Sequence, residues 1–500
     1  MSDAQAGTMP GAAALQSRGE RVARNAALLS AGQVSARALQ TVWLLFLARH
    51  LGAERYGVYT LAISFVGFVS IVSDLGVGLI VLRQSAQNPD QAPGLVAAGL
   101  RLVSVLSLAA VALAVGLTLA LGYRGEILLI STVAAASIIP NAFFSLASVV
   151  FQTHERFGLV AAFTLVNLVM GIAFGAVALV LGAGVLGLAV AIVVAAAVNA
   201  VASWTVALRF VRPSFGGGRR LARPLLVAAL PLGLAAYAQT AAFRVDNLLI
   251  AHALGVKILA YYGLAFMFYS SAVELFFTPL IGVTFPLMSR VAQESADELR
   301  RVLRRTFGLV LVILLPLAAG AFILAEPIIR FGLGPSYRPA APVLRILILA
   351  LVPTAYWGTL TKAMIVRRRH GAYIATFLAL LGFVATGVSV GLRVHGVTGA
   401  AAGVLCAHVA TSLLAALLMR EYAWIVDVSR TLKVLAATAA MVGVAWSLRH
   451  QPVLLAVGAG AAVYGLTALL IGVLDSYDRR ALVDGLWGPI GRLVSSPRTR

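Results

Sequence analysis

The sequence predicts an all-α polytopic membrane protein with about fourteen transmembrane helices. Its 500 residues are 61% hydrophobic and 11% charged, with a mean hydropathy of +0.95, whereas a soluble chain carries about a quarter charged residues. Apolar stretches long enough to cross a bilayer follow one another along the chain. Because the hydrocarbon holds no water, each span must satisfy its own backbone hydrogen bonds, which a helix does. The expected spans are 26–48, 57–81, 95–121, 126–150, 158–182, 184–208, 225–250, 259–288, 307–331, 342–365, 371–393, 396–419, 431–448 and 452–474.

The basic residues lie mainly on alternate connections. Of the 39 lysines and arginines, 27 lie in the two tails and the even-numbered connections, and nine in the odd-numbered ones. Basic loops stay in the cytoplasm, so we expect both termini to be cytoplasmic, and an even number of spans permits that. The net charge of +21 therefore indicates contact with anionic headgroups of membrane lipids and not with nucleic acid.

Several classes of site are not expected. The first 24 residues are polar, and the first apolar segment is too long for the core of a cleavable signal peptide. The single cysteine, Cys406, lies within a span and allows no intrachain disulfide. The seven histidines are scattered without metal-ligand spacing. We expect neither a metal nor another cofactor.

The chain contains an internal repeat. Residues 48–65 and 251–268 are identical at seven positions with an offset of 203, and residues 184–189 resemble 396–401 at an offset of 212. Each offset maps a span onto the span six places later, so the two halves enter the membrane in the same direction, a known transporter plan. The expected division is a cytoplasmic N-terminal tail 1–24, an N-lobe 25–210, a basic cytoplasmic linker 211–224, a C-lobe 225–420, two extra helices 421–474 and a cytoplasmic C-terminal tail 475–500.

Polar residues form a matching stripe in the first span of each half. Steps of three, four and three residues place each set on one helix face. The stripes are Ser30, Gln33, Arg37 and Gln40 in span one, and Tyr237, Thr240, Arg244 and Asn247 in span seven. A charge at mid-membrane is costly unless it faces water or a partner. We expect Arg37 and Arg244, with these polar neighbours, to line an aqueous cavity and attract an anionic group of the substrate. The alternative is that each arginine pairs with a neighbouring helix and locks it.

Acidic residues follow in the second span of each half. Asp74 and Glu274 lie at near-equivalent positions of the repeat, so we expect a gate contact, or a proton or sodium site that drives transport. The alternative for Asp74 is that it caps or ends its helix. Asp246 lies beside the stripe, and we expect it to pair with Arg244 or another neighbour. His408 is alone on an apolar segment, which is typical of a hydrogen-bonded core histidine.

The motifs resemble a known family. The run Leu47-Ala48-Arg49-His50-Leu51-Gly52, followed by Tyr56-Gly57-x-Tyr59 and Asp74-Leu75-Gly76, looks like the start of the bacterial polysaccharide and oligosaccharide flippases, which are similar to O-antigen flippases. The segment from Asp246-Asn247 to Pro286-Leu287-Met288-Ser289 is similar to the middle of that family. These proteins form the polysaccharide transporter branch of the multidrug/oligosaccharidyl-lipid/polysaccharide exporter superfamily. The resemblance covers about residues 20–420.

The resemblance implies an inner-membrane flippase that moves an undecaprenyl-diphosphate-linked oligosaccharide from the cytoplasmic to the outer leaflet, for O-antigen, capsule or exopolysaccharide synthesis. It implies a V-shaped pair of helical lobes, a cationic cavity and alternating access. The expected partners are the lipid-linked oligosaccharide, membrane lipids, a proton or sodium ion for coupling, and a polysaccharide polymerase with its chain-length regulator. The arginines fit this substrate, because a guanidinium recognises phosphate through a planar fork of donors.

Two other functions remain open. A drug or cation antiporter of the same superfamily would favour acidic cavity residues, whereas this chain carries arginine on both stripes. An integral-membrane enzyme, such as a polysaccharide polymerase, needs carboxylates or a sizeable loop on the outer face. Here the longest outer connection is about 331–341, and no catalytic constellation recurs. We therefore expect no catalytic residues and no enzyme.

Overall fold

The computed structural model describes the backbone of residues 12–473 and the side chains of residues 35–473, except 217–219, 231, 232 and 235. The described residues form helices joined by short connections, with no strand among them. The helices before the middle of the chain are α1 Ala12–Val69, α2 Val77–Gln87, α3 Ala92–Ala120, α4 Glu126–Ala136, α5 Ile138–Thr153, α6 Phe157–Val180 and α7 Gly184–Ala207. The later helices are α8 Phe215–Ala242, α9 Val245–Leu254, α10 Val256–Ala272, α11 Thr278–Glu294, α12 Ala296–Ile323, α13 Ala325–Leu333, α14 Ala340–Leu349, α15 Leu351–Val366, α16 His370–Leu418, α17 Val428–Ser447 and α18 Val453–Leu470.

The helices account for all fourteen expected spans. Eleven helical stretches of the described residues are long and apolar enough to cross a membrane. Two of them contain two spans each, because the backbone turns at Gly52 within α1 and at His395 and Gly396 within α16. The remaining expected span, 225–250, is formed by the second half of α8 together with α9. The predicted fold class is confirmed.

The turns repeat as the sequence predicts. Gly52 has φ 74° and ψ 168°, and its counterpart Gly255 has φ 82° and ψ 170°. Gly184 and Gly396 likewise have φ of 59° and 60°. A residue with a β-carbon is strained in this region, so glycine is required at each of these turns. The repeat seen in the sequence is therefore a repeat of backbone conformation.

The second span of each half is interrupted at the same place. In the first half, a 3₁₀ turn, η1 Ser70–Ser73, separates α1 from α2. In the second half, a π-helical turn, η3 Val273–Phe277, separates α10 from α11. These segments are 203 residues apart, like the identical motifs.

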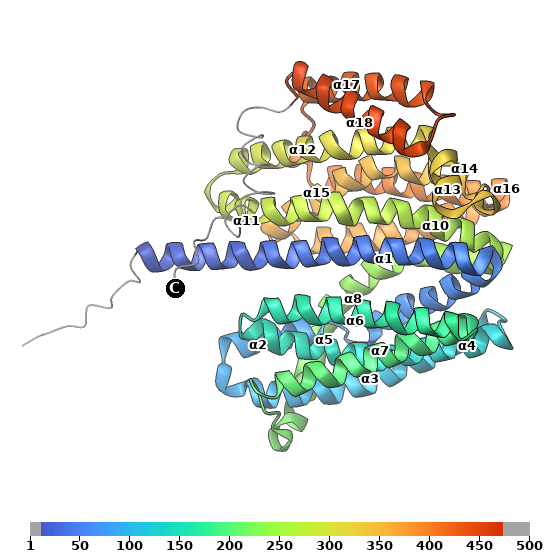
Figure 1. The fold of residues 1–500 in the computed structure, drawn as a ribbon. Helices are drawn as coiled ribbons and strands as arrows, with labels where there is room; N and C mark the ends of the chain where they lie inside the picture. Colours follow the sequence, from blue (N-terminus) through green and yellow to red (C-terminus); the bar gives the residue numbers. More distant parts are fainter. Residues whose placement is uncertain (1–11, 474–500) are drawn as a thin grey trace, which may run out of the picture.

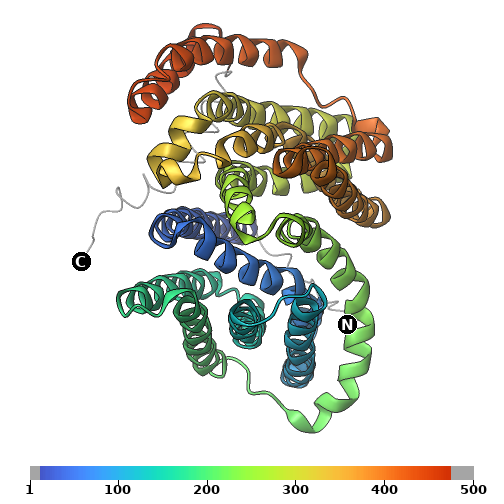
Figure 2. The ribbon, with the colours of Figure 1, turned by 90° about the vertical axis from the view of Figure 1, so that its right-hand side faces the viewer.

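Helices α1–α7 and α8–α16 form two lobes, named here the first and second lobe (Figure 1). Within the first lobe, α3, α5, α6 and α7 pack on one another, and within the second, α10, α12, α14, α15 and α16 do so. Two helices join the lobes. α1 packs against α4 and α6 and also against α10, while α8 packs against α3 and against α16. Figure 2 shows α8 running from one lobe to the other along the edge of the molecule.

α17 and α18 lie outside both lobes. They pack on each other and mainly on α12, at the margin of the molecule (Figure 1). Tyr464 of α18 donates a hydrogen bond to the carbonyl of Val312 on α12, at 2.6 Å. This position agrees with two helices added outside the repeat.

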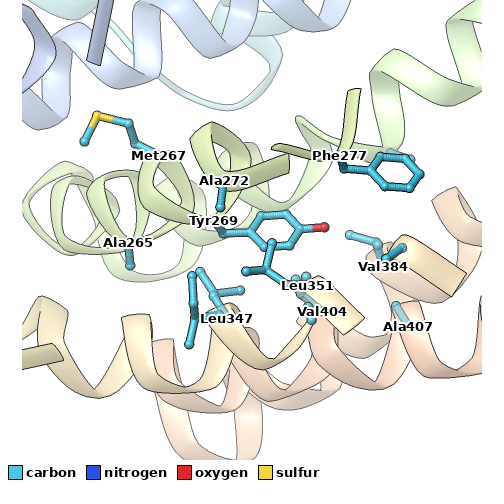
Figure 3. Packing of buried hydrophobic residues seen from close by; sticks show 14 of the residues in the cluster. Ala265, Met267, Tyr269, Ala272, Phe277, Leu347, Leu351, Val384, Val404 and Ala407 are labelled. Carbon is cyan, nitrogen blue, oxygen red and sulfur yellow. The ribbon is translucent and has the colours of Figure 1, made fainter. Parts of the chain in front are cut away.

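The largest buried cluster lies in the second lobe. It joins α10, α14, α15 and α16, and Figure 3 shows the ring of Tyr269 among Leu351, Val384 and Val404. Many large apolar side chains elsewhere are exposed, including Val180 on α6 and Leu470 on α18. Such a surface is suited to lipid, because lipid tails solvate apolar side chains.

Two segments differ from their expected boundaries. α1 begins at Ala12, so the part of the N-terminal tail that the structure describes is helical. α8 begins at Phe215, so most of the expected linker is the first part of a helix. This part is held by the first lobe: Ser214 N–H donates to the carbonyl of Pro93, and Arg101 donates to the carbonyl of Phe215. The C-terminal tail 475–500 lies outside the described residues.

Candidate functional site at the contact between the lobes

Arg37 lies on α1 where the two lobes meet. Its Nη2 donates a hydrogen bond to Ser270 Oγ at 2.6 Å, and its Nη1 donates to Gln40 Oε1 at 3.0 Å. Its Nε lies 3.2 Å from Glu274 Oε2. Ser270 belongs to α10 and Glu274 to η3, so Arg37 joins the first lobe to the second. This geometry is the one expected if Arg37 pairs with a neighbouring helix, which is the alternative prediction. A role of Arg37 in a substrate cavity remains a prediction.

Glu274 is presented by the π-helical turn η3. About half of its side chain is exposed (51%), whereas the side chain of Arg37 is 17% exposed. π-Helical turns are rare and occur frequently at functional sites. A half-exposed carboxylate in the middle of a transmembrane segment is costly unless water or a partner reaches it. For Glu274 that partner is Arg37 of the first lobe.

Arg244 lies at a break in span seven. It directly precedes α9, with a non-helical backbone, and its side chain is half-buried against α1. A β-carbon on Gly67 would lie 2.9 Å from Arg244 Nε, so glycine makes room for the guanidinium there. Both predicted arginines thus lie at α1: Arg37 belongs to this helix and pairs with Glu274, and Arg244 packs against it at Gly67.

The other polar residues of the two stripes lie in different surroundings. Gln40 orients Arg37, as described above. Thr240 is half-buried, one turn of helix before the break. Asn247 is buried, and its Nδ2 donates a hydrogen bond to Ser64 Oγ at 3.0 Å across the lobe contact. The side chain of Gln33 lies outside the described residues.

Asp74 caps a helix. Its Oδ1 accepts a hydrogen bond from Gly78 N–H at 2.9 Å, in the first turn of α2. The chain has just turned through Leu75 (φ 42°) and Gly76 (φ 82°). The helix-cap interpretation describes the geometry, and a coupling role for Asp74 remains a prediction.

The turn after Asp74 packs closely on α8. A β-carbon on Gly233 would lie 2.2 Å from the carbonyl oxygen of Leu75, and one on Gly76 would lie 3.0 Å from the carbonyl oxygen of Ala229. Two backbones therefore touch where α8 crosses from the first lobe to the second. The break in span two is fixed by this contact.

The sequence predicts that Asp246 pairs with Arg244 or another neighbour, and the structure gives it a tyrosine as hydrogen-bond partner. Asp246 is buried, and Tyr262 Oη donates a hydrogen bond to its Oδ2, while the N–H of Asn247 donates to its Oδ1 at 2.8 Å. The sequence did not identify the hydroxyl partners of the polar side chains at the lobe contact. These partners are Tyr262 for Asp246, Ser64 for Asn247 and Ser270 for Arg37. Hydroxyl groups at apolar-looking positions of α1 and α10 were the available signal, but only the packing shows which of them face a charge.

His408 is the hydrogen-bonded core histidine that the sequence predicts. Its Nδ1 lies 3.0 Å from Thr354 Oγ1 and accepts a hydrogen bond from Trp357 Nε1 at 3.2 Å. Tyr269 Oη lies 2.7 Å from the same threonine oxygen. The group joins α10, α15 and α16. Within the described residues, no group of three or more potential metal ligands occurs.

Comparison with known proteins decides the family. Residues 46–342 match the family model described as polysaccharide biosynthesis protein. The chain belongs to this family. No curated protein matches the chain. The family resemblance found in the sequence is confirmed.

Solved structures of transporters share the fold. The lipid II flippase MurJ, in an inward closed conformation, is 14% identical, with a TM-score of 0.75 over 89% of this chain and 98% of that chain. An inward-facing multidrug resistance MATE family transporter of the MOP superfamily is 17% identical, with a TM-score of 0.66 over 79% and 98%. A MOP superfamily transporter from Pyrococcus furiosus is 16% identical, with a TM-score of 0.58 over 80% and 96%. At these identities the likeness concerns the fold alone.

Proposed function

We propose that this protein is a flippase for an undecaprenyl-diphosphate-linked oligosaccharide, which it moves from the cytoplasmic to the outer leaflet by alternating access for the synthesis of a surface polysaccharide. One observation carries the proposal: Arg37 and Arg244 come from different lobes and both lie at the contact of α1 with the second lobe, Arg37 beside Glu274 and Arg244 against Gly67. A diphosphate is strongly anionic and fits such a pair of guanidinium groups. Membership of the polysaccharide biosynthesis family supports a glycan substrate.

The division and orientation of the molecule are part of the proposal. The N-lobe 25–210 and the C-lobe 225–420 rock against each other, and both termini are cytoplasmic in the bacterial inner membrane. The alternation of basic connections supports this orientation. The end of the molecule at Gly52 and Gly255, named here the Gly52 end, then faces the outside.

The test is export in a flippase-null strain. We expect Arg37→Ala and Arg244→Ala each to abolish complementation while the protein still reaches the membrane, because each removes a phosphate-binding guanidinium. The matched control is Arg338→Ala, since Arg338 is exposed at the Gly52 end and pairs with Glu326 at 2.8 Å. Full export by both variants would overturn the assignment. Drug resistance conferred by the wild type, without export, would instead support the antiporter.

A further inference from the structure

We propose that Glu274 is an internal competitor of the substrate: its carboxylate occupies Arg37 in the empty protein, and a diphosphate headgroup displaces it and so releases α1 from η3. This inference rests on the proposed function and adds a residue that makes lobe opening depend on the charge of the ligand.

The ion pair between Arg37 and Glu274 is of a kind that a ligand can displace. Arg37 Nε lies 3.2 Å from Glu274 Oε2 but makes no hydrogen bond of good geometry, so the contact is electrostatic and is not a two-pronged arginine–carboxylate fork. The Glu274 side chain is half exposed, whereas that of Arg37 is 17% exposed. Without a fork of hydrogen bonds, an ion pair with one half-exposed partner is weaker than a bidentate one. A ligand with more charge can therefore take the place of the carboxylate.

The local charges favour such a ligand. Glu274 is the carboxylate next to Arg37, and Asp246 is two residues from Arg244 in the chain. Asp246 is already engaged by Tyr262 and by a backbone N–H, which leaves Glu274 as the exposed carboxylate. A diphosphate carries more negative charge and more acceptor oxygens than one carboxylate, so it offers a guanidinium more charge-assisted hydrogen bonds.

Arg37 keeps one of its contacts when Glu274 leaves. Gln40, on the same helix, holds one terminal nitrogen of the guanidinium, whereas Ser270 of α10 holds the other only while α1 and α10 touch. Beside them, the hydroxyl oxygens of Thr41 and Ser271 lie 3.0 Å apart across the same contact. The guanidinium is thus pre-oriented for an anion, and the Thr41–Ser271 pair reports whether α1 and α10 are in contact.

Binding of farnesyl diphosphate to the purified full-length protein, measured by calorimetry, tests the competition. We expect Glu274→Gln to bind roughly threefold to tenfold more tightly than the wild type, the gain set by the ion pair that no longer has to be broken. Farnesyl monophosphate should gain less, because it presents fewer charges. The gain should vanish when Arg37→Gln is added. Glu326→Gln, which removes a carboxylate from a surface ion pair, should change nothing.

Cross-linking tests the release. In a Cys406→Ser background, the pair Thr41→Cys and Ser271→Cys should form a disulfide readily while Glu274 is present, more slowly with farnesyl diphosphate, and slowly with Glu274→Gln added even without ligand. Glu274→Asp keeps the charge and serves where Glu274→Gln fails to accumulate; its shorter side chain should give an intermediate rate.

The outcomes separate the two proposals. Wild-type binding of the diphosphate with no effect of Glu274→Gln on affinity or cross-linking would overturn the competitor role and leave the flippase standing. Absence of diphosphate binding in every variant would argue against the flippase, whatever the cross-linking rate.

Discussion

At the scale of single residues, charge is positioned by small neighbours. Arg244 fits against α1 because residue 67 is glycine, and Arg37 is oriented by Gln40 and Ser270. The arginines were recognisable in the sequence, since two of them recur at related depths in the two halves. Their partners were not, because a serine or a glycine within an apolar segment carries no sign of what it will face.

The space at Gly67 gives a test of the position of Arg244. In Gly67→Ala, a β-carbon would lie 2.9 Å from Nε and 3.3 Å from Cζ of Arg244, so the guanidinium must move. We expect export to fall about tenfold at unchanged membrane levels, as small misplacements of a binding group do. Gly116→Ala is the control, because nothing lies within 4 Å of its β-carbon. Equal export by both variants would show that the position of Arg244 does not matter.

At the scale of elements, the spans are broken where they carry charge. Arg244 lies at the α8–α9 break, Glu274 in a π-helical turn and Asp74 after a 3₁₀ turn. Hydropathy predicts each of these spans as one continuous segment. Hydropathy does not reveal the breaks, because a break is stabilised by contacts between residues far apart in the sequence, such as Leu75 and Gly233.

The α16 hairpin gives a prediction at this scale. Its two arms touch through glycines, and a β-carbon on Gly391 would lie 2.1 Å from the carbonyl oxygen of Gly399. We expect Gly391→Ala to lower the unfolding free energy by about 1–3 kcal/mol, because two backbones must separate. Thermal unfolding in detergent measures the effect. Gly382→Ala on the same helix has nothing within 4 Å and should be neutral or stabilising; a similar loss in both would contradict the packing argument.

At the scale of the whole molecule, the lobes are joined at the Gly52 end. A β-carbon on Gly57 would lie 1.9 Å from the carbonyl oxygen of Val256, and Tyr337 Oη donates a hydrogen bond to the carbonyl of Ala48 at 2.6 Å. Burial raises the pKa of Tyr337, so the phenol keeps its proton and remains a donor at neutral pH. The contacts that close this end are thus backbone packing and neutral hydrogen bonds.

Removing the Tyr337 hydroxyl tests both closure and orientation. We expect Tyr337→Phe to lower the free energy that keeps the Gly52 end closed by about 0.5–1.5 kcal/mol. This corresponds to a roughly twofold to tenfold rise in the population of the open state. The measurement is labelling of Ala251→Cys, in a Cys406→Ser background, by a membrane-impermeant thiol reagent added outside the cell. Tyr356→Phe is the matched control, since its hydroxyl also donates to a backbone carbonyl, that of Ala423 at 2.7 Å, at the other end. Labelling from the cytoplasmic side alone would reverse the proposed orientation.

The class, the number of spans, the repeat and the charged residues within the membrane can all be read from the sequence. The class and the spans follow from hydropathy, a local quantity that lipid and water act on directly, and the repeat follows from identities at a fixed offset, which need no knowledge of packing. The tertiary structure decided which charges meet: Arg37 with Glu274 from the other lobe, Asp74 with the first turn of its own helix. That choice depends on how two lobes pack across the membrane, and packing joins residues more than 200 positions apart.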